Sequence, residues 1–274
     1  MNTPLEIAFK GLDKSPAIEA KIAEKASRLH KHFDRITHCR VVVSAPNKHA
    51  HKGKVYEIKI DIGIPEHAPI IVTHESAVGN ATEDLAIMRA MPGLTVIDPC
   101  DAAEIEQAVP AIAAYRGPVY MRLLRGNVPL VLDEYDYRFE LGKAKLLRDG
   151  ADVLVISSGL LTMRALEAAQ DLAADKVDVA VLHCPTIKPL DEAAIVEAVR
   201  CRHRLVVVAE NHSVIGGLGE AVASALLRHR VQPAGFQLAG LPDAFLDAGA
   251  LPTLHDRYGI SRQALAARIR VWLG

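Results

Sequence analysis

The sequence predicts an α/β protein in which a small α+β module precedes a larger, mostly parallel α/β region. Three observations support this prediction. The first 75 residues combine period-2 strand patterns with one amphipathic helix. From Ala81 onward, short runs of Val, Leu and Ile alternate with helical segments, which is typical of a sheet covered on both faces. No Pro-, Ser- or Gly-rich linker separates the two regions.

The first module is expected to have the element order βαβββ. Residues 4–9, P-L-E-I-A-F, alternate as a strand does. A helix is expected over 15–33, with Ser15 as its N-cap and Pro16 at its first position. Three further strands are expected at 39–45, 54–64 and 68–74.

The expected helix 15–33 has one apolar and one basic face. Its apolar stripe contains Ile18, Ile22, Ala26 and Leu29, and Lys21, Lys25, Arg28 and Lys31 lie away from it. Residues 1–75 hold 12 Lys and Arg against 9 Asp and Glu, although the whole chain has a net charge of −1. Such a face is either simply solvated or binds an anionic partner.

The stretch S-P-A-I-E-A-K-I-A-E-K-A-S-R-L-H-K-H-F-D-R-I-T-H-C-R-V-V-V-S resembles the ribosome hibernation promoting factors. The resemblance covers residues 1–76. It implies a βαβββα fold that binds the small ribosomal subunit, with Lys25, Arg28 and Lys31 facing rRNA phosphates. The family's second basic helix is replaced here by the shorter N-A-T-E-D-L-A-I-M-R-A-M-P-G, whose only cation is Arg89. We therefore expect weakened ribosome binding and a short substitute helix.

The second region is expected to contain repeated helix–strand units. Strands are expected at 94–99, 117–123, 151–157, 177–183, 204–210 and 234–240. Helices are expected at 82–90, 100–115, 162–174, 191–200, from about Gly216, and at 261–273.

Several stretches of this region resemble the C-terminal part of transketolase-like proteins. They are E-D-L-A-I-M-R-A-M-P-G-L-T-V-I-D-P, G-P-V-Y-M-R-L-L-R, P-T-I-K-P-L-D and A-E-N-H-S-V-I-G-G-L-G. The resemblance implies a remnant of the pyrimidine-binding domain at 77–128 and a C-terminal domain at 137–274. The remnant is expected to lack its sheet partners and to be the least stable segment, unless it docks on the C-terminal domain.

The resemblance implies thiamine diphosphate and Mg²⁺ for the parent family, but we expect this chain alone to bind neither. The family's G-D-G…N metal motif is absent, and so is the half-domain that would carry its catalytic glutamate. The family's T-H-Q histidine is replaced at Val78-Gly79-Asn80. No catalytic residue and no metal ligand is therefore assigned.

One residue matches the family's substrate site. Arg125 corresponds to its phosphate-binding arginine, but because the rest of the site is missing, a surface or ion-paired role is favoured here. The Gly216-Gly217-Leu218-Gly219 cluster is interpreted as allowing close strand-to-helix packing. Glu210-Asn211-His212 is interpreted as structural or interfacial.

Two functional hypotheses follow. In the first, the chain is a fusion of the two families that is not catalytic alone, with a weakened ribosome-binding module as its working part. In the alternative, it is the C-terminal subunit of a split transketolase that acts with a separate diphosphate-binding subunit. Because C-terminal domains of the transketolase family sit in dimer interfaces, the resemblance also implies self-association as a homodimer. The four cysteines form no C-x-x-C pair, and no apolar run has signal-peptide or membrane-spanning length, so a cytoplasmic location is expected.

Overall fold

A computed structural model describes residues 5–32, 36–44, 56–63, 70–76, 83–123, 129–244 and 251–274. The chain forms two compact units. The first comprises Met1–Asn80 with Ala113–Tyr120, and the second comprises Ala81–Ile112 with Met121–Gly274. None of the helices in the described part of the chain has the length and apolar character needed to cross a bilayer.

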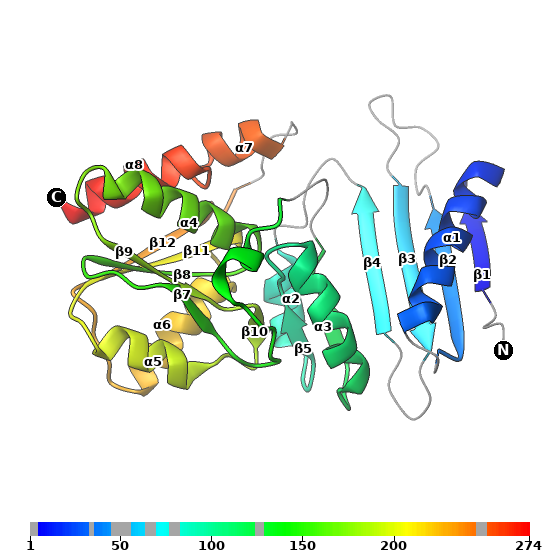
Figure 1. Ribbon diagram of the computed structural model, residues 1–274, viewed down its shortest axis with the longest axis horizontal. Helices are drawn as coiled ribbons and strands as arrows, with labels where there is room; N and C mark the ends of the chain where they lie inside the picture. The colour runs from blue at the N-terminus through cyan, green and yellow to red at the C-terminus, as the bar shows by residue number, and fades with distance from the viewer. Residues whose placement is uncertain are drawn as a thin grey trace. The chain divides into compact units, whose positions relative to one another are not determined.

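The first unit is a four-stranded sheet with one helix across a face (Figure 1). The strands lie side by side in chain order; the first pair is parallel and the next two are antiparallel. The elements are β1 (Leu5–Lys10), α1 (Pro16–His32), β2 (His38–Ser44), β3 (Tyr56–Gly63) and β4 (Ile70–Ser76). The expected βαβββ order is confirmed.

The core of the first unit lies between α1 and the sheet. Its buried centre is Cys39, Val41 and Val43, alternate residues of β2. Partly buried apolar side chains pack around them, among them Phe9 and Ile22. The alternation of β2 therefore places one of its faces in the core.

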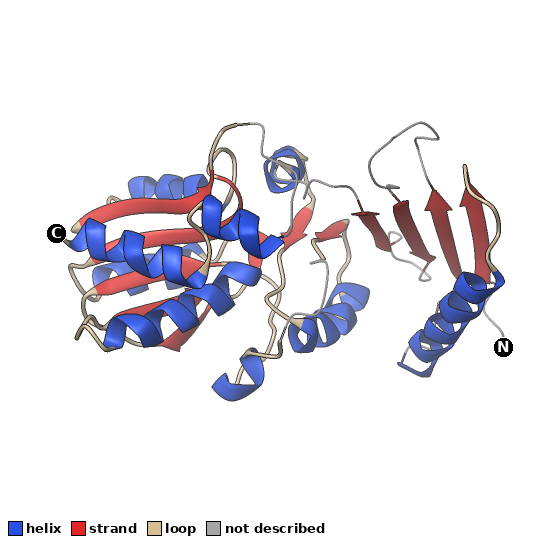
Figure 2. Ribbon diagram, turned by 90° about the horizontal axis from the view of Figure 1, so that it is seen from above, coloured by secondary structure: helices blue, strands red, loops and turns tan. Residues whose placement is uncertain are grey.

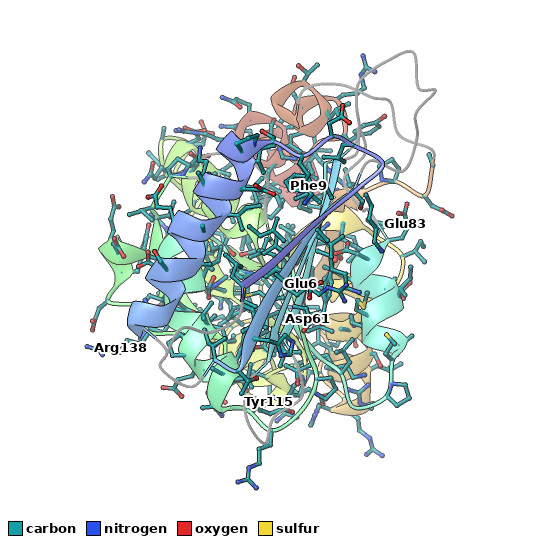
Figure 3. The ribbon with its side chains drawn as sticks, turned by 90° about the vertical axis from the view of Figure 1, so that its right-hand side faces the viewer. Glu6, Phe9, Asp61, Glu83, Tyr115 and Arg138 are labelled. Atoms are coloured by element: carbon teal, nitrogen blue, oxygen red, sulfur yellow. The ribbon has the colours of Figure 1, made fainter. Side chains whose placement is uncertain are left out.

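The opposite face of this sheet is charged. Arg40 of β2 lies in register between Glu6 of β1 and Asp61 of β3, and its Nε is 3.3 Å from Glu6 Oε2. Figure 3 shows Glu6 and Asp61 near each other on this face. Such cross-strand charge pairs suit a surface that faces water.

The second unit contains a five-stranded sheet in the order β12-β11-β8-β9-β7. All its pairs are parallel except β7–β9. Helices α4 and α8 cover one face, and α5 and α6 the other (Figures 1 and 2). The elements are β7 (Lys145–Arg148), β8 (Val153–Ser157), α4 (Leu160–Ala173), β9 (Val179–His183), α5 (Glu192–Arg200), β11 (Leu205–Ser213), α6 (Leu218–Arg228), β12 (Gly235–Leu241), α7 (Leu251–Arg257) and α8 (Arg262–Leu273).

A three-stranded sheet, β10-β5-β6, involves the segment expected to be a domain remnant. Strand β10 comes from the C-terminal region and pairs antiparallel with β5, placing Thr186 opposite Ile97. The remnant strands therefore do have a sheet partner, contrary to the expectation that they would lack one. The elements are α2 (Asp84–Ala90), β5 (Thr95–Ile97), α3 (Ala102–Ala114), β6 (Val119–Met121), the 3-10 helix η1 (Leu132–Tyr135) and β10 (Thr186–Lys188).

Candidate functional site

A buried charge cluster lies where β5 and β6 end. Arg122 follows β6 and Asp98 follows β5, whereas Asp84 is the first residue of α2. Arg122 Nε is 3.1 Å from Asp84 Oδ2, and its Nη1 is 3.9 Å from Asp98 Oδ1. All three side chains are at least nine-tenths buried. Two carboxylates thus share one guanidinium in a place that water does not reach.

The C-terminal region contributes the remaining partners of this cluster. Arg122 Nη1 donates to the Asn211 carbonyl oxygen at 2.7 Å, at the end of β11. Ser158 Oγ, just after β8, donates to Asp98 Oδ2 at 2.8 Å. Burial raises the pKa of Asp98, and the nearby guanidinium and hydroxyl oppose that rise. We call Asp84, Asp98, Arg122, Ser158 and Asn211 the Arg122 cluster; it joins residues 84–122 to the C-terminal region.

The glycine cluster before α6 is occupied by a carboxylate of the chain itself. Glu210 accepts hydrogen bonds from the backbone N–H groups of Leu218, at 2.7 Å, and Gly219, at 2.9 Å. A Cβ atom at Gly217 would overlap this carboxylate. The interpretation of the glycines as residues for close packing is confirmed. A phosphate could not take the same N–H groups without displacing Glu210.

Burial sets the protonation of Glu210 and its neighbour. It raises the pKa of Glu210 to about 7, although the two backbone N–H groups favour the ionised form. Burial also lowers the pKa of His212, which favours the neutral imidazole. That form fits its contacts, because Nδ1 lies 2.7 Å from the Ser213 carbonyl oxygen while Nε2 accepts from Ala86 N–H at 3.4 Å. His212 thus connects β11 to α2.

A second buried network surrounds Glu104 of α3. Tyr137 Oη donates to Glu104 Oε1, and Cys100 N–H donates to Oε2 at 2.6 Å. His183 Nε2, at the end of β9, lies 3.0 Å from Oε1. On the other side of the ring, His183 Nδ1 lies 2.7 Å from Thr162 Oγ1 of α4. We call Cys100, Glu104, Tyr137, Thr162 and His183 the Glu104 cluster.

The Glu104 cluster has the hydroxyl–imidazole–carboxylate order of a hydrolase triad. Thr162, His183 and Glu104 are however all completely buried, and a nucleophile must reach its substrate. Burial also raises the pKa of Tyr137 and Cys100, so neither group is activated. The arrangement therefore serves packing, and it ties α3 to the C-terminal region.

The described residues do not fit thiamine diphosphate and Mg²⁺. Within the described ranges, no group of three or more His, Cys, Asp or Glu side chains is placed to hold a metal ion. The N-terminus of α6 already holds the Glu210 carboxylate. We therefore derive no chemical step through this cofactor on this chain.

The side chains that the sequence predicted as site residues all lie outside the described part of the structure. Arg125 lies outside the described residues. Lys25, Arg28 and Lys31 lie on α1 as expected, but their side chains fall outside the described part of the structure. Their assigned roles stay predictions.

Sequence reasoning missed both buried clusters. The available signals were a histidine ending the apolar strand V-A-V-L-H and an aspartate directly after T-V-I. Neither signal indicates which distant side chain the histidine or the aspartate contacts.

Three family models match parts of the chain. Residues 142–265 match the transketolase C-terminal domain. The transketolase pyrimidine-binding domain matches residues 57–131. Residues 5–88 match the family of sigma 54 modulation protein and S30EA ribosomal protein. This match overlaps the match to the pyrimidine-binding domain. The limits 1–76, 77–128 and 137–274, and the fusion itself, stay predictions.

Individual transketolase relatives extend this finding. A transketolase family protein of Sinorhizobium fredii, y4mN, is 65% identical over 219 residues, which are 80% of this chain and 64% of the relative. The 6-deoxy-6-sulfo-D-fructose transketolase subunit SqwH of a Clostridium species is 40% identical over 183 residues, 67% of this chain and 56% of the relative. The chain thus spans less than two thirds of each of these proteins.

A solved structure supports the same relationship. A protein described as a split gene transketolase, inactive beta4 tetramer, superimposes with a TM-score of 0.65 at 39% sequence identity. The superposition covers 71% of this chain and 62% of that one.

Proposed function

We propose that the chain is the C-terminal part of a two-chain transketolase and acts with a separate subunit that binds the diphosphate. The observation that carries this proposal is the 39% identity to a split gene transketolase over 71% of the chain. SqwH, also named as a subunit of a transketolase, matches over 67% of the chain. Both favour the hypothesis of a split enzyme over that of a fusion without catalysis.

The buried clusters support a preassembled half-enzyme. The Arg122 cluster holds the start of α2 and the ends of β5 and β6 against β8 and β11. The Glu104 cluster holds α3 against α4 and β9. A segment fixed in this way can present one surface to a partner chain, because it needs no ordering when the partner binds.

The side chains of this chain indicate which of the two subunits would hold the cofactor. Because the described residues of this chain do not fit the cofactor, the diphosphate and its Mg²⁺ would be held by the partner. The cofactor, when bound, supplies the carbanion chemistry of ketol transfer.

The proposal is tested by mixing this chain with a separately produced diphosphate-binding subunit of a split transketolase. Ketol transfer between sugar phosphates is measured with and without thiamine diphosphate. We expect transfer in the complete mixture and none from either chain alone. If a complex forms but no ketol transfer is measured, the proposed partner subunit is supported and the proposed catalytic role is contradicted. Neither a complex nor transfer would contradict the proposal.

A second function is favoured by the match of residues 5–88 to the ribosomal protein family and by the βαβββ order of β1–β4. We infer weak binding to the small ribosomal subunit through Lys25, Arg28 and Lys31. Binding that depends on phosphate contacts falls steeply with salt. We expect co-sedimentation with small subunits at low salt and its loss in the triple Lys25→Glu, Arg28→Glu, Lys31→Glu variant. No pelleting at low salt would contradict this second function.

A further inference from the structure

A cationic pocket lies inside the second unit, between α2, α5, α6 and the segment that follows β10. Its volume is about 360 Å³, which is within the range of small-molecule sites. Arg89, Lys188 and Arg228 line it together with one carboxylate, that of Glu192. Three cations against one anion leave the lining with a formal charge of about +2.

Two of the three cations form no salt bridge within the described residues. Arg89 Nη1 donates to the carbonyl oxygens of Gly216 and, at 2.7 Å, Gly217. Lys188 Nζ donates to the carbonyl oxygens of Arg89, at 2.9 Å, and Met91, at 2.5 Å. These neutral acceptors fix the two side chains, although the carboxylates of Glu210 and Glu220 offset part of the charge of Arg89. The Lys188 ammonium has three donors.

The third cation has an exchangeable partner. Arg228 binds Glu192 and also donates to Ser224 Oγ at 2.5 Å. Glu192 has a second partner, because its Oε2 lies 2.9 Å from His229 Nε2. The Arg228–Glu192 pair is partly exposed, so separating it costs little. An incoming anion can take over Arg228 while Glu192 keeps His229.

We propose that this pocket binds the phosphate group of a small phosphomonoester. A phosphomonoester carries nearly two negative charges at neutral pH, which match the charge of the lining. Guanidinium groups are well suited to binding phosphate oxygens. Pro189 and Leu190 supply an apolar wall for the carbon skeleton. This inference is independent of the proposed function, because it concerns binding to this chain alone.

The test is calorimetric titration of the full chain with glucose 6-phosphate, with glucose as the uncharged counterpart and inorganic phosphate as the bare anion. We expect saturable binding of glucose 6-phosphate, weaker binding of inorganic phosphate and none of glucose. No saturable binding of glucose 6-phosphate would overturn the proposal, and so would equal binding of glucose.

Two variants and a matched control locate the site. Arg228→Gln is expected to weaken glucose 6-phosphate binding about tenfold, because it removes one charge-assisted contact. Arg230→Gln removes the same charge two residues away, outside the pocket lining, and should leave binding unchanged. Glu192→Gln should tighten binding several-fold by freeing Arg228. Equal weakening by both arginine variants, or weakening by Glu192→Gln, would overturn the assignment.

Discussion

Arg122 supplies the positive charge of a buried cluster that contains two carboxylates. Its guanidinium contacts Asp84, Asp98 and a carbonyl oxygen of β11, so it serves three elements at once. A buried charge that loses its partner is costly, because neither water nor another cation compensates it. The stability of the second unit should therefore depend strongly on this residue.

Replacing Arg122 by Met should lower the free energy of unfolding of the second unit by about 3–5 kcal/mol, because Asp84 and Asp98 would stay buried without their cation. The measurement is urea unfolding followed by fluorescence of Trp272 on α8, the single tryptophan of the chain. The matched control is Arg270→Met, which breaks an exposed pair with Asp175 and should cost at most about 1 kcal/mol. Equal effects of both substitutions would contradict the structural role of Arg122.

Glu210 should make stability depend on pH. Its pKa is raised from 4.5 to about 7 in the folded chain, so between these values the folded state keeps a proton that the unfolded state has released. Stability should therefore fall as pH rises from about 4.5 through about 7, by roughly 3 kcal/mol in total.

The Glu210→Gln variant isolates this contribution. His212 lies 3.9 Å from Glu210 and also titrates, but it is present in both proteins. Urea unfolding at pH 5, 6, 7 and 8 should therefore show that the stability of the unsubstituted chain falls relative to that of the variant as pH rises. Parallel pH profiles would rule out a raised pKa of Glu210.

Helix α3 and strand β5 are held by elements far away in the sequence. Strand β10 pairs with β5, and the Glu104 cluster connects α3 to α4 and β9. The part of residues 83–123 that belongs to the second unit therefore does not depend on its own strands alone.

Tyr137→Phe tests this docking. It removes the hydrogen bond from Tyr137 to the Glu104 carboxylate and should cost about 1.5–3 kcal/mol, the usual range for a bond to a charged group. Tyr135→Phe removes the same atom two residues earlier and should change stability by less than about 0.5 kcal/mol. Both are measured by urea unfolding with Trp272 fluorescence. No difference between them would show that the bond contributes nothing to docking.

Most elements of the second region could be predicted from the sequence, whereas four short ones could not. Each expected helix and strand of the second region has a counterpart, because apolar periodicity marks such elements. Strands β7 and β10, η1 and α7 were not expected. Strand β10 has only three residues and lies between Pro185 and Pro189, so it carries no periodic pattern.

The polar clusters were unpredictable for a different reason. Glu104 and His183 are 79 positions apart, and Arg122 and Asn211 are 89 positions apart. Only the fold brings them together. By contrast, Glu210 follows an apolar strand and precedes a glycine cluster, so its structural role could be inferred locally.

The molecule as a whole matches the transketolase C-terminal domain over residues 142–265, and its N-terminal part matches a ribosomal protein family over residues 5–88. Its transketolase-like region shares 40% identity with a protein named as a transketolase subunit, and it covers 56% of that protein. Its described residues form two buried polar clusters, and none of their His, Cys, Asp and Glu side chains form a group of three or more placed to hold a metal ion. These features agree with the proposal that this chain functions in a complex with a second subunit.

Light scattering coupled to size-exclusion chromatography tests that claim most directly, with this chain, a diphosphate-binding transketolase subunit and their equimolar mixture. The proposal predicts a new species in the mixture, whose mass is a whole-number combination of the two chains. Two peaks that keep the masses of the separate proteins would contradict it.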